Sequence, residues 1–363
     1  MVHKCNSLSC NRDDFITPIL KVTENCNFSC DFCRYHLNKR KSVMDFETYK
    51  AVVEKACDYN MSHGWKHLNV IYHGGEPLLW GVQNFERAIA FQEDLKNKYS
   101  GISIINNIQT NGSLLNQKWI NFLKENDFHI GVSIDGPEEI NFHKSHSGNQ
   151  NVIRNIHELN DTGCNFGILS VITDAHKGFA DKYYDFLVEN SIHSVGLCYC
   201  IYDDKKGVTV DNRILSNFLL AFFNRYYYGN YHLRVREFEY VMQLCLGAST
   251  NACTFSFRNK CGYALSVLPN GDVYFCDPYS FDAKALGNIL INDFFDIQAS
   301  KELIAIITDA KESARLECDN CEIREICGGG CYRHVFSDGK NAFCETFKVL
   351  YPYIRKIVSK NNE

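Results

Sequence analysis

Three cysteines near the start of the chain are spaced so that they could hold a metal cluster. Cys26, Cys30 and Cys33 form a C-x3-C-x2-C pattern. Cysteine thiolates hold iron–sulfur clusters, and a 4Fe–4S cluster in an electron carrier takes four of them. Three thiolates would leave one iron open to an outside ligand, which suits a cluster that binds and cleaves a molecule. For this pattern alone, structural zinc with His36 as fourth ligand is the alternative, although zinc fingers usually use other spacings.

The composition limits what the chain can be. Its 363 residues are 45% hydrophobic, enough for a barrel with an extension or for two domains. The net charge of −5 gives no basic surface for nucleic acid. The chain start lacks a signal-peptide core, and no apolar run is long enough to span a membrane, so we expect a cytoplasmic protein. With 18 cysteines in a reducing compartment, metal binding is expected rather than disulfides, and oxygen-sensitive clusters suggest an anaerobic setting.

Short apolar runs alternate with amphipathic stretches between residues 17 and 200. The predicted strands are Pro18–Val22, Leu68–Tyr72, Ser103–Ile108, His129–Ile134, Phe166–Ile172 and Ser194–Tyr199. The predicted helices between them are Phe46–Asp58, Asn84–Lys98, Gln117–Glu125, Val152–Asn160 and Ala180–Glu189. Parallel strands need crossover helices, so the repeats predict an α/β fold, a partial (β/α)6 TIM-like barrel. Active sites of such barrels lie at the carboxyl ends of the strands, where the three cysteines follow the first strand.

Polar and glycine-rich segments follow the next three predicted strands. They are His73-Gly74-Gly75-Glu76-Pro77, Gln109-Thr110-Asn111-Gly112 and Ser133-Ile134-Asp135-Gly136. Paired glycines let a ligand approach the backbone, and Glu76 offers a carboxylate to a ligand ammonium. Each segment alone could be a plain turn. Together they place polar groups around one rim of the predicted barrel.

Cysteines become dense after about residue 230. Leu265–Leu268 and Val273–Phe275 flank a Pro-Asn-Gly-Asp turn, which predicts a β-hairpin, and Val349–Ser359 is a predicted helix. We expect an extension at 1–16, a barrel at 17–235, a cysteine-rich domain at 236–348 and a final helix at 349–363. The cysteines from Cys261 to Cys344 form an array with the pattern C-x9-G-x4-C, then C-x2-C-x5-C-x3-C, then one more cysteine. With Cys253 upstream, its eight thiolates could close two further 4Fe–4S clusters or two zinc sites.

The first trio and the Gly-Gly-Glu-Pro segment resemble the radical S-adenosylmethionine superfamily, and the later array resembles its SPASM extension. The resemblance runs from about residue 15 to 350. It implies S-adenosylmethionine and three 4Fe–4S clusters as cofactors, with Cys26, Cys30 and Cys33 on the cluster whose open iron chelates the cofactor. The first auxiliary cluster would then be held by Cys253, Cys261, Cys276 and Cys331, with Cys245 as the competitor of Cys253. The second would be held by Cys318, Cys321, Cys327 and Cys344.

The resemblance also implies contacts to the cofactor. Gly74, Gly75 and Glu76 match the motif for its methionyl amino group, and Gln109 and Asn111 lie at the next strand end. Ser133 and Asp135 match residues near its ribose and carboxylate. Many relatives then have an arginine that pairs with the carboxylate. Here residues 141–146 contain no arginine, and Lys144 would supply a less rigid positive charge, unless these are solvated loop residues.

Three residues are expected near the substrate. In anaerobic sulfatase-maturing enzymes, an aspartate at the place of Asp277 is thought to take the substrate's proton, and Tyr35 matches a tyrosine near the substrate. The glutamine of those enzymes before Gly-Gly-Glu-Pro is His73 here, and histidine at this place is common among maturases of ribosomal peptides. The alternatives are packing of Tyr35 on the cluster and a turn role for Asp277.

The resemblance implies a radical oxidoreductase that removes a hydrogen from a side chain. Our first expectation is a maturase that oxidises or crosslinks a ribosomally made peptide. The alternatives are conversion of a sulfatase Ser or Cys to formylglycine, a small-molecule dehydrogenase, and a non-catalytic electron carrier. The expected partners are a peptide or protein substrate and a low-potential electron donor such as flavodoxin or ferredoxin. Only 25 residues precede Cys26, so a leader-binding protein would be separate.

Overall fold

The core of the structure is a curved sheet with helices on its outer face. The computed structural model describes residues 15–31, 33, 41–141, 149–203, 208–248, 261–277, 283–316, 318–335 and 339–360. Its ten-stranded sheet has the order β12-β11-β10-β1-β2-β3-β4-β5-β6-β9. Neighbours from β1 to β6 pair in parallel. These strands are β1 (Thr17–Thr23), β2 (His67–Gly74), β3 (Ser103–Thr110), β4 (His129–Ser133), β5 (Phe166–Ile172) and β6 (Ser194–Tyr199).

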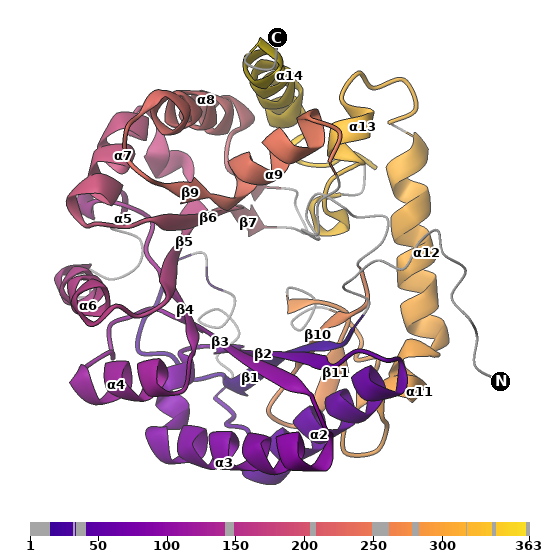
Figure 1. Cartoon of the computed structure of the whole chain (residues 1–363). Coiled ribbons are helices and arrows are strands. Elements are labelled where there is room, and N and C mark those ends of the chain that lie inside the picture. The colour runs from indigo at the N-terminus through magenta and orange to yellow at the C-terminus, as the bar shows by residue number, and fades with distance from the viewer. Residues whose placement is uncertain are drawn as a thin grey trace.

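The crossover helices lie outside this sheet, as Figure 1 shows. They are α2 (Phe46–Ser62), α3 (Val82–Lys98), α4 (Gln117–Glu125), α6 (Asn149–Thr162) and α7 (Ala180–Glu189). Capping side chains start some of them: Asp45 accepts the backbone N–H of Thr48, and Asn116 that of Trp119. The predicted strands and helices are therefore confirmed, with small differences at their ends, and so is the partial barrel.

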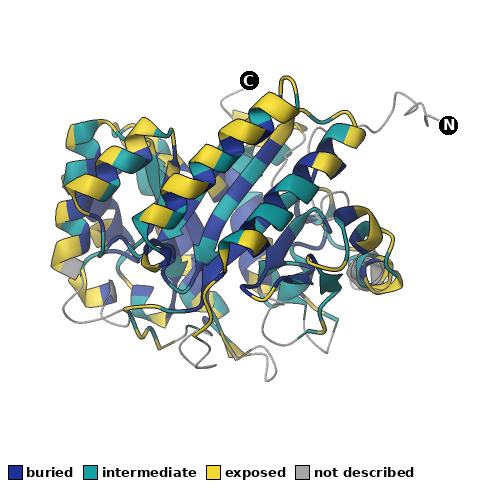
Figure 2. Ribbon diagram, turned by 90° about the horizontal axis from the view of Figure 1, so that it is seen from below, coloured by how far each residue is buried: buried dark blue, intermediate teal, exposed yellow. Residues whose placement is uncertain are grey.

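Burial alternates along the barrel strands. In β2, Leu68, Val70 and Tyr72 are buried against the helices, whereas Asn69, Ile71 and His73 are less buried and face the interior. Figure 2 shows the same division, with exposed residues on the outer sides of the helices. The inner face of the barrel is thus the polar and accessible one.

The sequence analysis missed several elements after β6. These are α8 (Asn212–Tyr228), β9 (Arg234–Val235), α9 (Arg236–Cys245) and α12 (Lys301–Leu316). β9 pairs in parallel with β6 and extends the sheet at that edge. The shorter elements are η1 (Pro77–Trp80), α5 (Glu138–Asn141), η2 (Asp174–His176), β7 (Ile201–Asp203), β8 (Val208–Thr209), α13 (Arg324–Cys327) and η4 (Tyr332–His334).

The cysteine-rich region joins the other edge of the barrel sheet. β10 (Ala264–Val267) pairs in parallel with β1, and β11 (Asp272–Tyr274) pairs antiparallel with β10, which confirms the hairpin. From α2, Lys55 Nζ donates to the backbone oxygens of Ile289 (2.7 Å) and Asn292 (2.8 Å) of this region. The remaining elements are β12 (Gly287–Asn288), α11 (Phe294–Gln298) and α14 (Cys344–Lys360).

α14 is the predicted final helix, and it starts five residues earlier than expected, at Cys344. It packs against α8 and α9 and so ties the end of the chain to the barrel. The domain boundaries expected at residues 235 and 348 stay predictions. Within the described ranges, every helix is too short or too polar to serve as a membrane span.

Candidate active site at the carboxyl end of the barrel

The first cysteine trio lies directly after β1 and is held by residues that follow β3. Asn111 Nδ2 donates to Cys26 Sγ (3.9 Å) and to Asn27 Oδ1 (2.9 Å). Asn27 Nδ2 in turn donates to Ser113 Oγ (2.8 Å). Cys26 is exposed and Cys30 and Cys33 are partly exposed, so the thiols are open to a cluster and its ligand. Asn111, expected to contact the cofactor, therefore also fixes the cysteine segment.

The paired glycines after β2 make room for the chain's own backbone. Gly75 N–H donates to Thr23 O (2.8 Å), and Glu76 N–H donates to Asn25 O (2.7 Å). A Cβ atom on Gly74 would lie 2.1 Å from Thr23 O, and one on Gly75 would lie 2.2 Å from Asn25 O. The expected approach of a ligand to these glycines stays a prediction. In the structure they admit the segment that leads from β1 into the cysteines.

The Glu76 carboxylate joins the ends of β2 and β3. It is fully buried and accepts hydrogen bonds from Leu78 N (3.1 Å), Thr110 Oγ1 (2.7 Å) and Asn111 N (2.8 Å). Burial raises the pKa of Glu76 to about 7, against the lowering effect of these bonds. A contact between Glu76 and the cofactor ammonium stays a prediction. Its hydrogen bond with Asn111 links Glu76 to the residue that contacts Cys26.

The residues expected near the ribose and carboxylate take different positions. Gln109 Nε2 donates to Ser133 Oγ (2.8 Å), and both face the barrel interior. Asp135 is only 2% exposed, and its Oδ1 accepts Val171 N–H (2.7 Å) from β5. Its backbone oxygen lies 3.0 Å from Nε2 of the buried His176. Asp135 thus braces neighbouring strand ends, while Gln109 and Ser133 remain the accessible pair.

Two of the expected catalytic residues meet at a third residue that the sequence analysis missed. Lys21 of β1 is fully buried and stands opposite His73 in the register of β1 and β2. Its Nζ lies 3.2 Å from His73 Nδ1 and forms an ion pair with Asp277. Burial lowers the pKa of Lys21 to about 7, and burial with the Lys21 charge holds the pKa of His73 well below its usual range. A lone lysine in the apolar run Pro18–Val22 was the signal that could have revealed it.

The later cysteines lie at both ends of the β10–β11 hairpin and in the segment that leads to α14. Cys261 precedes β10, and Cys276 follows β11 directly before Asp277. Burial, together with the nearby thiols of Cys344, Cys318 and Cys321, raises the pKa of Cys327 to about 12. The four cysteines expected on the second auxiliary cluster therefore lie together. Thiolates are the usual ligands of iron–sulfur clusters, so this donor set fits such a cluster.

The structure does not describe every predicted site residue. Tyr35, Lys144 and Cys253 lie outside the described residues. Cys245, the competitor of Cys253, ends α9, and its thiol interacts with Arg355 of α14. Among the residues that the structure describes, no group of three His, Cys, Asp or Glu side chains is arranged to hold a single metal ion.

A cavity of about 870 Å³ opens inside the barrel. Its walls include the amino ends of the strands, among them His129, Phe166 and Ser194, so it opens at the end of the barrel opposite the cysteine trio. The polar side chains of Asn107 and Gln109 line its inner wall. Gly131 of β4 leaves room for Gln109, whose Oε1 would lie 2.2 Å from a Cβ atom at that position. This cavity is therefore distinct from the space beside the cysteine trio, and Gln109 is the one predicted site residue, of those that the structure describes, that lines it.

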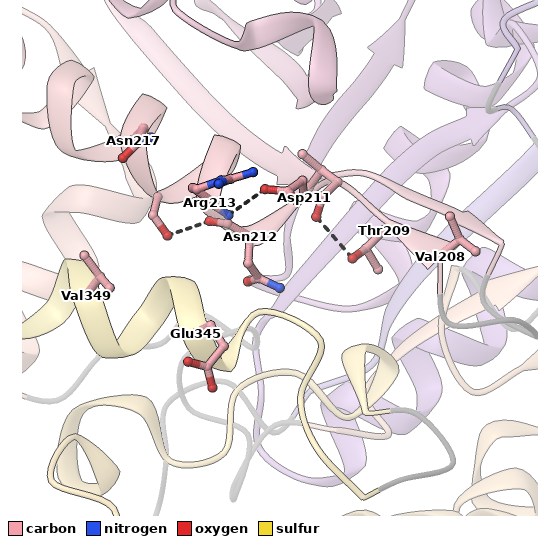
Figure 3. A pocket seen from close by; sticks show the side chains of 10 residues that line it. Val208, Thr209, Asp211, Asn212, Arg213, Asn217, Glu345 and Val349 are labelled. Atoms are coloured by element: carbon pink, nitrogen blue, oxygen red, sulfur yellow. Dashed lines mark hydrogen bonds between the residues drawn. The ribbon is translucent and has the colours of Figure 1, made fainter.

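A second pocket, of about 730 Å³, lies where α8 begins beside α14 (Figure 3). Asp211 caps α8 there by accepting the backbone N–H groups of Arg213 and Ile214. Glu345, which follows Cys344, lines its other side. None of the predicted site residues lines this pocket, so it is separate from the carboxyl-end site.

Two family models match the chain. Residues 20–186 match the radical SAM superfamily, and residues 260–322 match SPASM, an iron–sulfur cluster-binding domain. The cysteine-type anaerobic sulfatase-maturating enzyme of Clostridium perfringens is 26% identical over 361 residues, with 92% of this chain and 95% of that protein covered. The serine-type enzyme of Bacteroides thetaiotaomicron is 27% identical over 372 residues, with 92% and 86% covered.

Solved structures with the same fold include complexes with peptides. Native anSMEcpe with bound AdoMet and Cp18Cys peptide matches with a TM-score of 0.82 and 25% identity, covering 95% of this chain and 99% of that one. SuiB of Streptococcus suis bound to precursor peptide SuiA matches with a TM-score of 0.63, covering 88% and 72%. SuiB is 18% identical, so this second likeness concerns the fold alone.

Proposed function

This chain is a radical S-adenosylmethionine enzyme with a SPASM domain, and we propose that it converts a cysteine or serine of a sulfatase to formylglycine. The observation that carries the proposal is a likeness to sulfatase-maturating enzymes over 92% of the chain, through both domains. It reverses the order of our expectations, in which a maturase of small ribosomal peptides came first. The peptide complex of anSMEcpe supports a peptide or protein segment as substrate.

The cofactors of this family fit the residues present. Cys26, Cys30 and Cys33 would hold the cluster that binds S-adenosylmethionine, and the later cysteines would hold the auxiliary clusters. When bound, S-adenosylmethionine supplies the 5′-deoxyadenosyl radical that removes a hydrogen atom, and a low-potential donor such as flavodoxin or ferredoxin supplies the electron for its cleavage. The described residues hold the cysteine segment in place. Asn111 donates a hydrogen bond to Cys26, and the Glu76 carboxylate accepts one from the backbone of Asn111, which joins the ends of β2 and β3.

We assign to Asp277 the role of the base that accepts a proton from the substrate side chain. Oxidation of the side chain to the aldehyde level removes one hydrogen atom, one proton and one further electron. Serine then gives the aldehyde directly, whereas cysteine gives a thioaldehyde that water converts to the aldehyde with release of hydrogen sulfide. Asp277 directly follows Cys276, so a carboxylate that accepts the proton would lie beside a cluster ligand that leads to an electron acceptor. The Asp277 side chain is 34% exposed, which leaves it accessible from the interior while Lys21 pairs with it.

The test is to offer the reduced holoenzyme two kinds of substrate. One is a peptide that spans the modified cysteine or serine of a sulfatase from the same organism, and the other is a precursor peptide encoded beside the gene. We expect an aldehyde on the sulfatase peptide, detected by hydrazide labelling and mass spectrometry. A crosslink or a two-hydrogen loss in the precursor peptide alone would contradict the proposal.

A peptide maturase remains the second candidate because of one residue. His73 stands where sulfatase-maturing enzymes carry glutamine, and histidine there is common among maturases of ribosomal peptides. Exchanging His73 for Gln therefore gives a useful comparison. If the chain matures a sulfatase, H73Q should retain aldehyde formation, whereas a peptide maturase should lose its product.

A further inference from the structure

We propose that Lys21 is a positioning residue of this enzyme, which holds Asp277 and His73 together and places a positive charge between the segments that carry Cys33 and Cys276. The inference goes beyond the proposed function, because it holds for any substrate. It rests on contacts among β1, β2 and the residue after Cys276.

The sheet order brings these three residues together. β1 lies between β2 and β10 in the sheet, and β10 pairs with β11. Lys21 and His73 are register partners, so their side chains share the inner face. Asp277 reaches the same point from the segment after β11 and pairs with Lys21 Nζ. Distant parts of the chain, from both domains, therefore meet at one ammonium group.

The charges around Lys21 explain how a fully buried lysine is tolerated. Burial lowers its pKa, and the charges of Cys276 and Cys33 are the largest effects that raise it again. One of these cysteines belongs to the first trio and the other to the auxiliary array. Arg333 is a second positive charge near this point.

A purely structural role would not require a lysine. Replacing a buried ion pair by apolar groups is often neutral or stabilising. Here the partner carboxylate is partly exposed, so water can solvate Asp277 when Lys21 is removed. Lys21→Met is therefore expected to fold, and its effect should appear in the clusters and in the use of the radical.

The experiment measures the midpoint potential of each cluster in the reconstituted holoenzyme by titration followed with electron paramagnetic resonance. Lys21→Met and Lys21→Gln both remove the charge, and the glutamine keeps hydrogen-bonding capacity. Lys55→Met is the matched control, since Lys55 contacts only backbone oxygens of Ile289 and Asn292 among its described hydrogen bonds. We expect a lower midpoint in both Lys21 variants, because removing a nearby positive charge disfavours adding an electron.

The ratio of 5′-deoxyadenosine to modified product tests the contact with Asp277. We expect this ratio to rise in both Lys21 variants and to stay at the wild-type value in Lys55→Met. Unchanged midpoints in both variants would overturn the electrostatic part, and an unchanged ratio would overturn the positioning of Asp277. Loss of iron from both variants would also contradict the proposal, which gives Lys21 no role in holding a cluster. The midpoint does not depend on the substrate, so it can fail or succeed independently of the sulfatase proposal.

Discussion

Three ionisable side chains meet at the centre of the site, and their burial decides which chemistry they can do. Lys21 is inaccessible, and burial with the Lys21 charge beside it holds the pKa of His73 well below its usual range. His73 Nδ1 also accepts the N–H of Gly74 (2.7 Å), so this nitrogen acts as an acceptor. Of the three, Asp277, with a side chain that is 34% exposed, is the group that we propose accepts a proton from the substrate.

Replacing Asp277 by Asn should separate radical formation from product formation. Asparagine keeps the size of the side chain but cannot accept a proton as a carboxylate does, so product should fall by roughly 10²-fold or more. Formation of 5′-deoxyadenosine should continue, as measured by chromatography of the quenched reaction. Asp293→Asn is the control, because Asp293 only caps α11. Normal product yield from D277N would leave Asp277 with a structural role.

Glu76 should make stability depend on pH. Its folded pKa of about 7 lies above the usual 4.5, so the native state holds a proton that the unfolded chain releases between these values. The free energy of unfolding contributed by this group is full below pH 4.5 and is lost as the pH rises through 7. A shift of this size corresponds to on the order of 3 kcal/mol.

Glu76→Gln tests this, because glutamine does not titrate. Chemical unfolding of the iron-free protein should show that wild type loses stability relative to E76Q between pH 5 and pH 8, by roughly 2–3 kcal/mol. A constant difference between the two proteins across this range would mean that the carboxylate is ionised throughout, stabilised by the bonds from Leu78, Thr110 and Asn111.

Motif recognition found most of the single residues but not their contacts. The cysteines and the polar segments are visible as types and spacings, whereas the partners of Glu76 and Asp135 depend on how strand ends meet. Lys21 was missed because one charged residue in an apolar strand has no spacing to recognise. Its meaning comes from His73 and Asp277, which lie 52 and 256 residues further along the chain.

The end of β2 can lie against the segment after β1 because Gly74 and Gly75 have no side chains. Gly74→Ala should be much more damaging than an ordinary glycine substitution, since Gly74 has a φ of +134° and a Cβ atom there would overlap Thr23 O. Gly163→Ala is the matched control, with a φ of +67° and no atom within 4 Å of the new Cβ. Both substitutions also put a non-glycine residue at positive φ, which costs on the order of 1–3 kcal/mol.

Only Gly74→Ala should also displace the segment between β1 and the cysteine trio. We expect G74A to lose about four irons and all cleavage of S-adenosylmethionine, measured by iron analysis and 5′-deoxyadenosine assay. G163A should keep both and show only a slightly lower melting temperature. Equal behaviour of the two variants would mean that the contact of Gly74 with Thr23 does not hold the cluster segment.

Periodicity explains which elements could be predicted. Most of the six strands are short runs rich in apolar and β-branched residues with turn residues at their ends, so their positions could be predicted. α12 was missed because its apolar residues do not mark one face: Leu303 is buried, whereas the adjacent Ile304 is 53% exposed. β9 has only two residues and pairs with β6 through tertiary contact, so no local pattern could reveal it.

The barrel and the cysteine-rich region are joined at several places. β10 continues the barrel sheet beside β1, Lys55 ties α2 to the later region, and α14 closes against α8 and α9. Cys33 and Cys276 come from opposite ends of the chain but act on the same lysine. In the function proposed above, an auxiliary cluster on Cys276 would take an electron from the substrate, and Asp277, the next residue, would take the proton.

The iron content of the protein should show how many clusters its cysteines hold. The chain reconstituted without oxygen should bind about twelve irons, four for each cluster. Replacing Cys26, Cys30 and Cys33 by Ala should leave about eight irons and no cleavage of S-adenosylmethionine, because the open iron that chelates the cofactor is gone. Replacing Cys318 and Cys321 should also remove about four irons, but 5′-deoxyadenosine should still form, since the first trio is intact. Cleavage that survives in the triple variant, or zinc in place of iron at the auxiliary sites, would contradict this assignment of the cysteines.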